Sequence, residues 1–189
     1  FIATTFKNPA IAEAVMKLLY ERDGLALGIC NGFQALIKLG LVPYGDIREQ
    51  MPNAPTLTFN NISRHVSTIV NVRVATNKSP WLNACRVDDV YSVAVSHGEG
   101  RFVSSQEELD KLIKGGQVAT QYVDMFGSAT MQSPFNPNGS MNAIEGIISP
   151  DGRVLGKMGH SERIDANLYK NVEGNYDMKL FESGVKYFK

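Results

Sequence analysis

The chain has few of the features that would place it outside the ordinary globular class. It has only two cysteines in 189 residues, too few for a disulfide framework and without metal-site spacing, so a reducing compartment is the simplest expectation. It has no excess of either charge, because 19 Lys and Arg balance 19 Asp and Glu, which disfavours nonspecific binding to nucleic acid or anionic lipid. It has no apolar run near the roughly 20 residues that span a bilayer, and no signal-peptide pattern at its start. We therefore expect a cytoplasmic protein with no nucleic-acid or membrane partner.

What is present is an ordinary globular composition, 43% hydrophobic and 20% charged, which is enough for one core. One domain over residues 1–189 is therefore expected. The chain begins with Phe1 rather than an initiator Met, and its first residues open no obvious element. The sequence thus predicts a single domain in a chain that is a fragment.

The first 40 residues predict a helix, a strand and a second helix. Asn8 before Pro9 is typical of a helix start, because the Asn side chain can accept from free amides and Pro suits the first helical position. The apolar run 25–29 predicts a buried strand, and the residues after Cys30 carry an apolar helical face that ends at Gly40. Cys30 is therefore expected at a strand-to-helix turn.

Later segments rich in β-branched and aromatic residues predict further strands. Ser104 and Ser105 each precede a glutamate by three residues, which predicts a capped helix ending at Gly115-Gly116. A Ser-Pro-Asp-Gly turn predicts a hairpin near residue 150. The expected strands are 56–60, 67–75, 90–96, 117–123, 143–148 and 154–158.

The C-terminal segment predicts one more helix, packed on the body through an apolar face. Strands mixed with helices favour an α/β layer fold. The residues expected on that helical face are Leu180, Phe181, Val185 and Phe188.

Cys30 lies in the pentapeptide GICNG, which has the layout of a nucleophile elbow. Gly28 and Gly32 are expected to supply the space for a sharp turn that presents a reactive side chain. The positive end of the following helix favours the thiolate, and its free amides can hold an oxyanion. The alternative is a buried cysteine that serves as a small hydrophobic side chain, which is the commoner role. Cys85 has no glycine flanks, and we assign it that structural role.

A cysteine nucleophile needs a proton acceptor, and the sequence has three histidines. His65 precedes an alternating strand and is interpreted as a surface or sheet residue. His97 and His160 both follow strands, at the ends where α/β proteins build sites. Each has a glutamate two residues later, Glu99 and Glu162, which an extended chain turns to the same side. Residue chemistry alone leaves both pairs open, beside the alternative that either histidine only holds a loop.

Together, GICNGFQ and GHSER resemble the class I (triad-type) glutamine amidotransferases, whose cysteine motif pairs with a distant H-x-E. Further segments resemble the members that convert formylglycinamide ribonucleotide to its amidine in purine biosynthesis, more the C-terminal glutaminase domain of a large single-chain enzyme than a separate small subunit. The resemblance implies a three-layer, mostly parallel sheet flanked by helices, the flavodoxin-like architecture. It also implies that a strand and a glycine-rich oxyanion segment normally stand upstream. The further segments are GICNGFQALIKLGLVP, FNNISRHVS, AVSHGEGR, QYVD, NPNGS, DGRVLGKMGHSER and SGVKYF.

The resemblance assigns roles to matching positions. Cys30 matches the nucleophile, His160 the general base and acid, and Glu162 the residue that orients the imidazole. GHSER differs from the P-H-P-E-R form of related subunits but keeps His and Glu in register. The positions that match the substrate pocket are Gln34, Gly98 and Glu99.

The implied reaction is hydrolysis of the glutamine side-chain amide through a thioester on Cys30. Backbone amides including that of Asn31 hold the oxyanion, and His160 protonates the departing ammonia. The implied partners are glutamine and the synthetase region of the same enzyme, to which ammonia is passed. ATP and Mg²⁺ are expected in that synthetase region only. For this domain the sequence predicts no cofactor and no metal, since it has neither a phosphate loop nor a clustered ligand set.

Two other functions stay open at this point. A cysteine peptidase-like hydrolase uses the same elbow, and substrate choice separates it from a glutaminase. A noncatalytic partner-binding module is the second, because a domain without its upstream oxyanion segment can fold without turning over.

Overall fold

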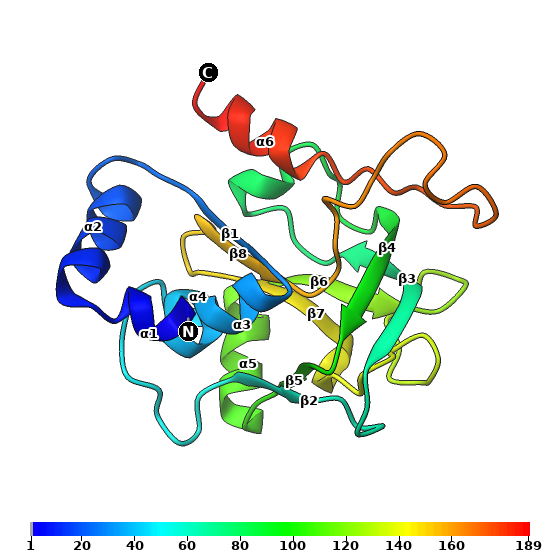
Figure 1. Cartoon of the computed structure of the whole chain (residues 1–189), viewed down its shortest axis with the longest axis horizontal. Helices are drawn as coiled ribbons and strands as arrows, with labels where there is room; N and C mark the ends of the chain where they lie inside the picture. Colours follow the sequence, from blue (N-terminus) through cyan, green and yellow to red (C-terminus); the bar gives the residue numbers. More distant parts are fainter. Residues whose placement is uncertain (1) are drawn as a thin grey trace.

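The computed structural model of the protein describes residues 2–189 and is organised around one large and one small sheet (Figure 1). Phe1, on which the expectation of a truncated start partly rests, lies outside the described residues. The large sheet has six strands in the order β1-β8-β7-β6-β3-β4. Its strands are β1 (Ala26–Ile29), β3 (Val66–Val74), β4 (Val90–His97), β6 (Val118–Val123), β7 (Ile144–Ile148) and β8 (Val154–Lys157). The small sheet pairs β2 (Thr56–Phe59) with β5 (Glu99–Val103).

Six α-helices and two short 3₁₀ helices complete the described residues. None of these helices combines the length and apolarity that a membrane span requires. The α-helices are α1 (Ile2–Phe6), α2 (Pro9–Tyr20), α3 (Asn31–Leu39), α4 (Leu41–Tyr44), α5 (Gln106–Gly115) and α6 (Leu180–Tyr187), and the 3₁₀ helices are η1 (Pro80–Leu82) and η2 (Met141–Ala143).

Strand direction corrects one expectation. The α/β class is confirmed, but the sheet is not mostly parallel. Among the described strands of the large sheet only β1 and β8 pair in parallel, and the other four pairings are antiparallel. The reason lies in the connections: β7 and β8 are joined by a short turn, and a short turn can link only antiparallel neighbours.

Both faces of the large sheet are covered, so the three-layer arrangement is confirmed. On one face α3 packs over β1 and β8, and α4 over β7 and β8, around a core that includes Phe33, Ile37 and Ile147. On the other face Val72, Tyr122 and Leu155 pack with side chains from η1 and the start of α6. Figure 1 shows α3 and α5 on one side of the sheet and α6 on the other.

The predicted caps at Asn8 and Ser105 are confirmed, whereas Ser104 does not cap and its hydroxyl donates to Ser105 O. The Ala10 backbone N–H donates to Asn8 Oδ1 at 3.1 Å at the start of α2. The Glu108 N–H donates to Ser105 Oγ at 3.3 Å at the start of α5, and Gly116 ends that helix with a left-handed φ of 63°. These signals are local in sequence, and the structure keeps them.

The C-terminal helix forms as predicted but packs through a different face. Phe181, Val185 and Phe188 are 53%, 56% and 59% exposed, and of the four expected residues only Leu180 is buried. The buried side also holds Ser183 and Gly184. A Cβ on Gly184 would lie 2.5 Å from the Trp81 ring, so the small residues are what let the helix approach η1.

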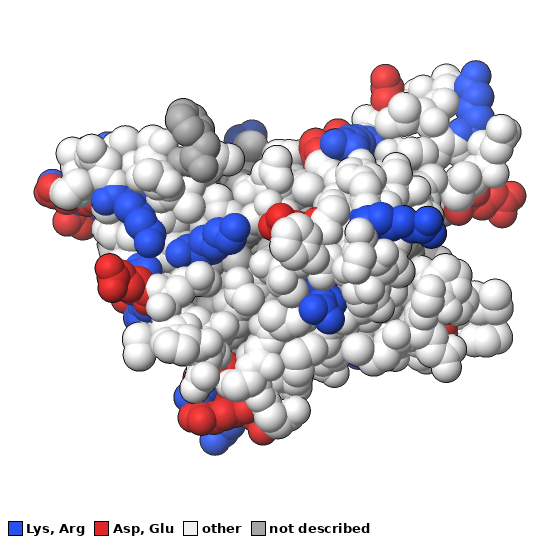
Figure 2. Space-filling model, turned by 60° about the horizontal axis from the view of Figure 1, so that its bottom comes forward, with Lys and Arg blue, Asp and Glu red and all other residues white. Residues whose placement is uncertain are grey.

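Charge is distributed as the balanced composition predicts. Figure 2 shows basic and acidic side chains interspersed over one face of the molecule. The surface in that view therefore combines both signs rather than presenting one.

Candidate active site

Cys30 lies at the predicted corner between β1 and α3, in a backbone conformation that L-residues rarely adopt. Its φ is 53° and its ψ is −106°. Its amide still donates to Lys157 O on β8 at 2.9 Å, and its carbonyl accepts from the Gln34 N–H at 3.0 Å. The corner is thus held from the sheet on one side and from the helix on the other. A strained non-glycine residue fixed in this way is typical of functional sites.

Only one of the two flanking glycines is needed for space. A Cβ on Gly28 would overlap Leu36 and lie 2.6 Å from the backbone carbon of Gly32. A Cβ on Gly32 would meet nothing within 4 Å. The prediction that both glycines make room is therefore correct for Gly28 and wrong for Gly32.

This difference predicts opposite effects for two similar substitutions. Gly28→Ala should lower the free energy of unfolding by about 1–3 kcal/mol, because the helix backbone must move away. Gly32→Ala should leave it unchanged or raise it by up to about 1 kcal/mol, since alanine is the better helix former. Urea denaturation of the two variants tests this. Equal destabilisation by both would contradict the different packing of the two glycines.

The thiol of Cys30 is buried, and this overturns the expectation of a thiolate in the free protein. Burial raises the pKa of the Cys30 thiol above its ordinary value, although a hydrogen bond from the Asn31 N–H and the charge of Arg163 oppose the rise. The thiol's own hydrogen-bond acceptor is Ser96 O, at 3.9 Å from Sγ. Desolvation outweighs these opposing contributions, so burial disfavours the thiolate in the free protein.

The two histidine–glutamate pairs that the sequence left open differ in the structure. His160 Nδ1 lies 2.6 Å from Glu162 Oε1. His97 Nδ1 instead lies 3.1 Å from Asn60 Oδ1, and burial lowers the pKa of His97 to about 4. The predicted carboxylate contact therefore forms at His160 and is replaced by an amide contact at His97.

The ring of His160 is arranged to exchange a proton at its second nitrogen. With Nδ1 donating to the Glu162 carboxylate, Nε2 carries the acceptor lone pair. Nε2 is buried and has no hydrogen-bond partner among the described residues. The backbone is fixed as well, because the His160 N–H donates to Ala94 O on β4 at 2.8 Å.

A single cavity of about 600 Å³ brings the predicted site residues together. Cys30, His160 and Gln34 line it, and Gln34 Nε2 donates to the backbone oxygen of Glu99 at 2.6 Å. Glu162, the remaining predicted residue, contacts His160 from behind. The full lining is Ile29, Cys30, Asn31, Gln34, Phe59, His65, Ser96, His97, Gly98, Glu99, His160 and Arg163.

Five lining residues were not among the predicted site residues: Ile29, Phe59, His65, Ser96 and Arg163. His65, interpreted from sequence as a surface or sheet residue, lines the cavity with Nε2 3.0 Å from Ser96 Oγ. Phe59 and Arg163 complete the rim. His65 lies beside the site because its neighbour Val66 pairs with His97. This pairing joins distant parts of the chain and cannot be seen in the local sequence pattern.

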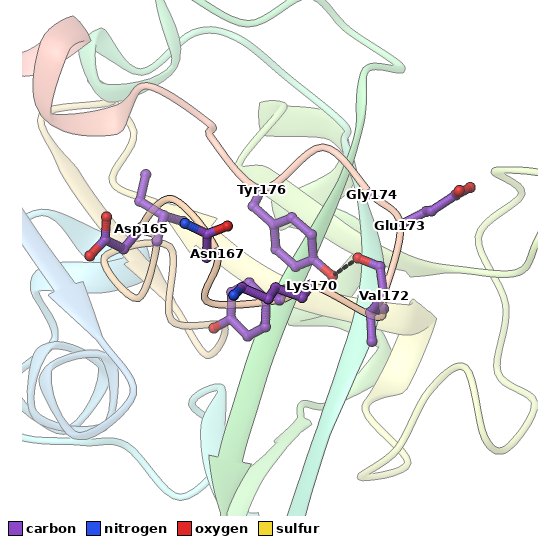
Figure 3. Close-up of a pocket in the computed structure, with 9 residues that line it drawn as sticks. Asp165, Asn167, Lys170, Val172, Glu173, Gly174 and Tyr176 are labelled. Carbon is purple, nitrogen blue, oxygen red and sulfur yellow. Dashed lines mark hydrogen bonds between the residues drawn. The ribbon is translucent and has the colours of Figure 1, made fainter.

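A second hollow, of about 570 Å³, lies within the loop that follows the site (Figure 3). Tyr169 and Tyr176 stack there with ring centroids 4.4 Å apart, and the Tyr176 hydroxyl donates to Val172 O at 3.0 Å. Its described lining carries neither cysteine nor histidine. This second hollow therefore offers no candidate nucleophile of the kind found in the first cavity.

Metal chemistry has no evident ligand set. Within residues 2–189 there is no group of three or more His, Cys, Asp or Glu side chains placed to hold a metal ion. The two cysteines are buried and unpaired with each other.

Comparison with known proteins gives a consistent set of relatives. A family profile for the CobB/CobQ-like glutamine amidotransferase domain matches residues 1–188. The chain is 39% identical over 157 residues to phosphoribosylformylglycinamidine synthase subunit PurQ of Chlorobaculum tepidum, covering 83% of this chain and 60% of that one. It is 38% identical over 182 residues to phosphoribosylformylglycinamidine synthase of Saccharomyces cerevisiae, covering 90% of this chain and 13% of that one.

A solved structure is similar to this chain over nearly its whole length. The structure of PurLQS from Thermotoga maritima superposes with a TM-score of 0.71 at 28% identity, over 99% of this chain and 72% of that one. The chain spans less than two thirds of the length of both curated relatives.

Proposed function

The chain belongs to the CobB/CobQ-like glutamine amidotransferase family, and from that membership we propose that it is the glutaminase domain of a phosphoribosylformylglycinamidine synthase. The observation that carries the proposal is one cavity that joins a cysteine on a strained strand-to-helix corner to a histidine oriented by a carboxylate. The names of both curated relatives support the particular ligase.

The reaction divides into two steps on the residues of this cavity. Cys30 passes its proton to His160 Nε2, and its sulfur attacks the side-chain carbonyl of glutamine. Burial raises the Cys30 pKa in the free protein, so the attack depends on His160 to accept the proton. Glu162 holds the ring and stabilises the imidazolium that forms.

The tetrahedral intermediate carries its charge on the former carbonyl oxygen. The Asn31 N–H, at the start of α3, is the donor in this chain suited to that oxygen. His160 then returns its proton to the departing nitrogen, and ammonia leaves with a thioester on Cys30. Water hydrolyses the thioester to glutamate and frees the thiol.

The substrate's amino-acid end is assigned to Gln34 and the Gly98-Glu99 segment. These residues line the cavity and are already joined by the Gln34 Nε2 hydrogen bond to Glu99 O. Ammonia is proposed to pass to a synthetase region that uses ATP and Mg²⁺ to make formylglycinamidine ribonucleotide. We place the reaction in the cytoplasm, where two unpaired cysteines stay reduced.

Substrate choice tests this proposal. The intact enzyme should release glutamate from glutamine and should leave peptide and ester substrates uncleaved, because the cavity is assigned to a free amino acid. Glutamate release is followed with glutamate dehydrogenase. Cleavage of peptides without glutamine hydrolysis would favour a cysteine peptidase, and an absence of both activities would favour a partner-binding module.

A further inference from the structure

Two charged side chains that the proposed mechanism does not use are fully buried directly beneath the His160 loop. Lys157 and Glu145 are both 0% exposed, and Lys157 Nζ lies 3.2 Å from Glu145 Oε1. They stand on neighbouring strands, at the end of β8 and near the start of β7. Burying two charges is costly even when they are paired, so their presence needs a purpose besides stability.

The pair makes hydrogen bonds to both sides of Gly159, the residue before His160. Lys157 Nζ donates to Gly159 O at 2.8 Å, and the Gly159 N–H donates to Glu145 Oε1. Glycine has more backbone freedom than any other residue, so without these bonds position 159 would sample many conformations. The two charges restrict it from its amide and from its carbonyl.

The other bonds of the pair reach beyond Gly159. Lys157 Nζ also donates to Ser161 Oγ at 3.0 Å, on the far side of His160. Glu145 Oε2 accepts from the Thr120 hydroxyl on β6, which fixes the carboxylate in the sheet. Residues on both sides of His160 are therefore connected to the same buried ammonium group.

We propose that the buried Lys157–Glu145 pair positions His160 by clamping Gly159 and Ser161, so that Nε2 keeps its direction into the cavity. This rests on the proposed function, because it concerns the same proton transfer. Lys157 and Glu145 are positioning residues: their bonds go to the loop backbone and Ser161, and neither lines the cavity.

Two variants of the intact enzyme separate positioning from stability. Lys157→Met removes the clamp and leaves a buried unpaired carboxylate, so both the melting temperature and kcat should fall. In the double variant Lys157→Met/Glu145→Gln no unpaired charge remains, and the amide oxygen still accepts from the Gly159 N–H. Its melting temperature should recover, while kcat for glutamine hydrolysis stays about 100-fold low with KM nearly unchanged, because the Gly159 carbonyl and Ser161 are still released.

Chemical labelling gives a readout besides turnover. A diazoketone analogue of glutamine, whose reaction at Cys30 needs the oriented imidazole, should label the double variant more slowly than the parent. Iodoacetamide, which reports access to the thiol, should label both at similar rates. Leu112→Ala, on the buried face of α5, is the control for general destabilisation and should keep the parental kcat below its melting temperature.

The outcomes are distinguishable. A parent enzyme that hydrolyses no glutamine would defeat the proposed function itself. An active parent and a folded double variant with parental kcat and parental diazoketone labelling would overturn the positioning role. A Leu112→Ala variant that loses kcat as strongly would overturn it too, by showing that loss of stability alone explains the effect.

Discussion

Replacing Cys30 by alanine is expected to abolish glutamine-dependent synthesis in the intact enzyme and to leave ammonia-dependent synthesis unchanged. The substitution removes the only sulfur in the cavity, so no thioester can form, and loss of a nucleophile lowers kcat by about 10⁴-fold or more. On the proposed function, ammonia added to the medium bypasses this domain and reaches the proposed synthetase region directly. Product formation is measured with each nitrogen source at the same enzyme concentration.

The matched control is Cys85→Ala. Cys85 is also buried and free, but it lies in the second core, where Sγ donates to Met178 O at 3.3 Å. Both activities should persist in that variant. Loss of ammonia-dependent synthesis in the Cys30 variant would mean structural damage and would contradict the assignment.

Replacing His160 by alanine is expected to lower glutamine hydrolysis by about 10²–10⁴-fold, the usual contribution of a general acid and base. His97→Ala is the internal comparison, because His97 is equally buried and lines the same cavity. It should cost no more than about tenfold, the equivalent of one or two hydrogen bonds such as that to Asn60.

The comparison is decisive because the two rings differ in what they contact rather than in where they lie. A His97 pKa of about 4 makes that ring a weak base, so it is poorly suited to accept the proton of Cys30. Glutamate release is measured for both variants after their melting temperatures are shown to match. An equal loss in both, or a larger one in His97→Ala, would contradict the assignment of His160 as the general base and acid.

Local signals in the sequence predicted much of this site. The strand-to-helix corner at Cys30 follows from an apolar run that meets a helical pattern between glycines. The contact of His160 with Glu162 follows from two positions on the same side of an extended chain. Helix caps at Asn8 and Ser105 were equally local and equally secure.

What the sequence did not predict depends on pairing between distant segments. β5 was missed because Glu99 and Gly100 have low β propensity, and the strand forms by pairing with the distant β2. The expectation of a mostly parallel sheet was wrong for the same reason, because the residues of a strand do not specify which strand it pairs with. The thiol's pKa was misjudged because the helix terminus is visible in the sequence and the burial that outweighs it is not.

Residue chemistry did not choose between the two histidines; the family resemblance chose His160, and the fold shows how their contacts differ. Both follow strands and both have glutamates at the same spacing, so residue chemistry alone left a tie. The contacts differ because of Asn60, which lies 37 residues from His97 in the chain and takes its Nδ1 contact. Glu99 does not make that contact, and its backbone oxygen accepts a hydrogen bond from Gln34 Nε2.

The central claim, that Cys30 is the reactive sulfur of a glutamine site, is tested most directly by reacting the intact enzyme with a glutamine-derived electrophile. Peptide mass spectrometry should find one adduct, on Cys30, whose formation glutamine prevents. An adduct on Cys85, or an enzyme that hydrolyses glutamine yet carries no adduct, would contradict the claim.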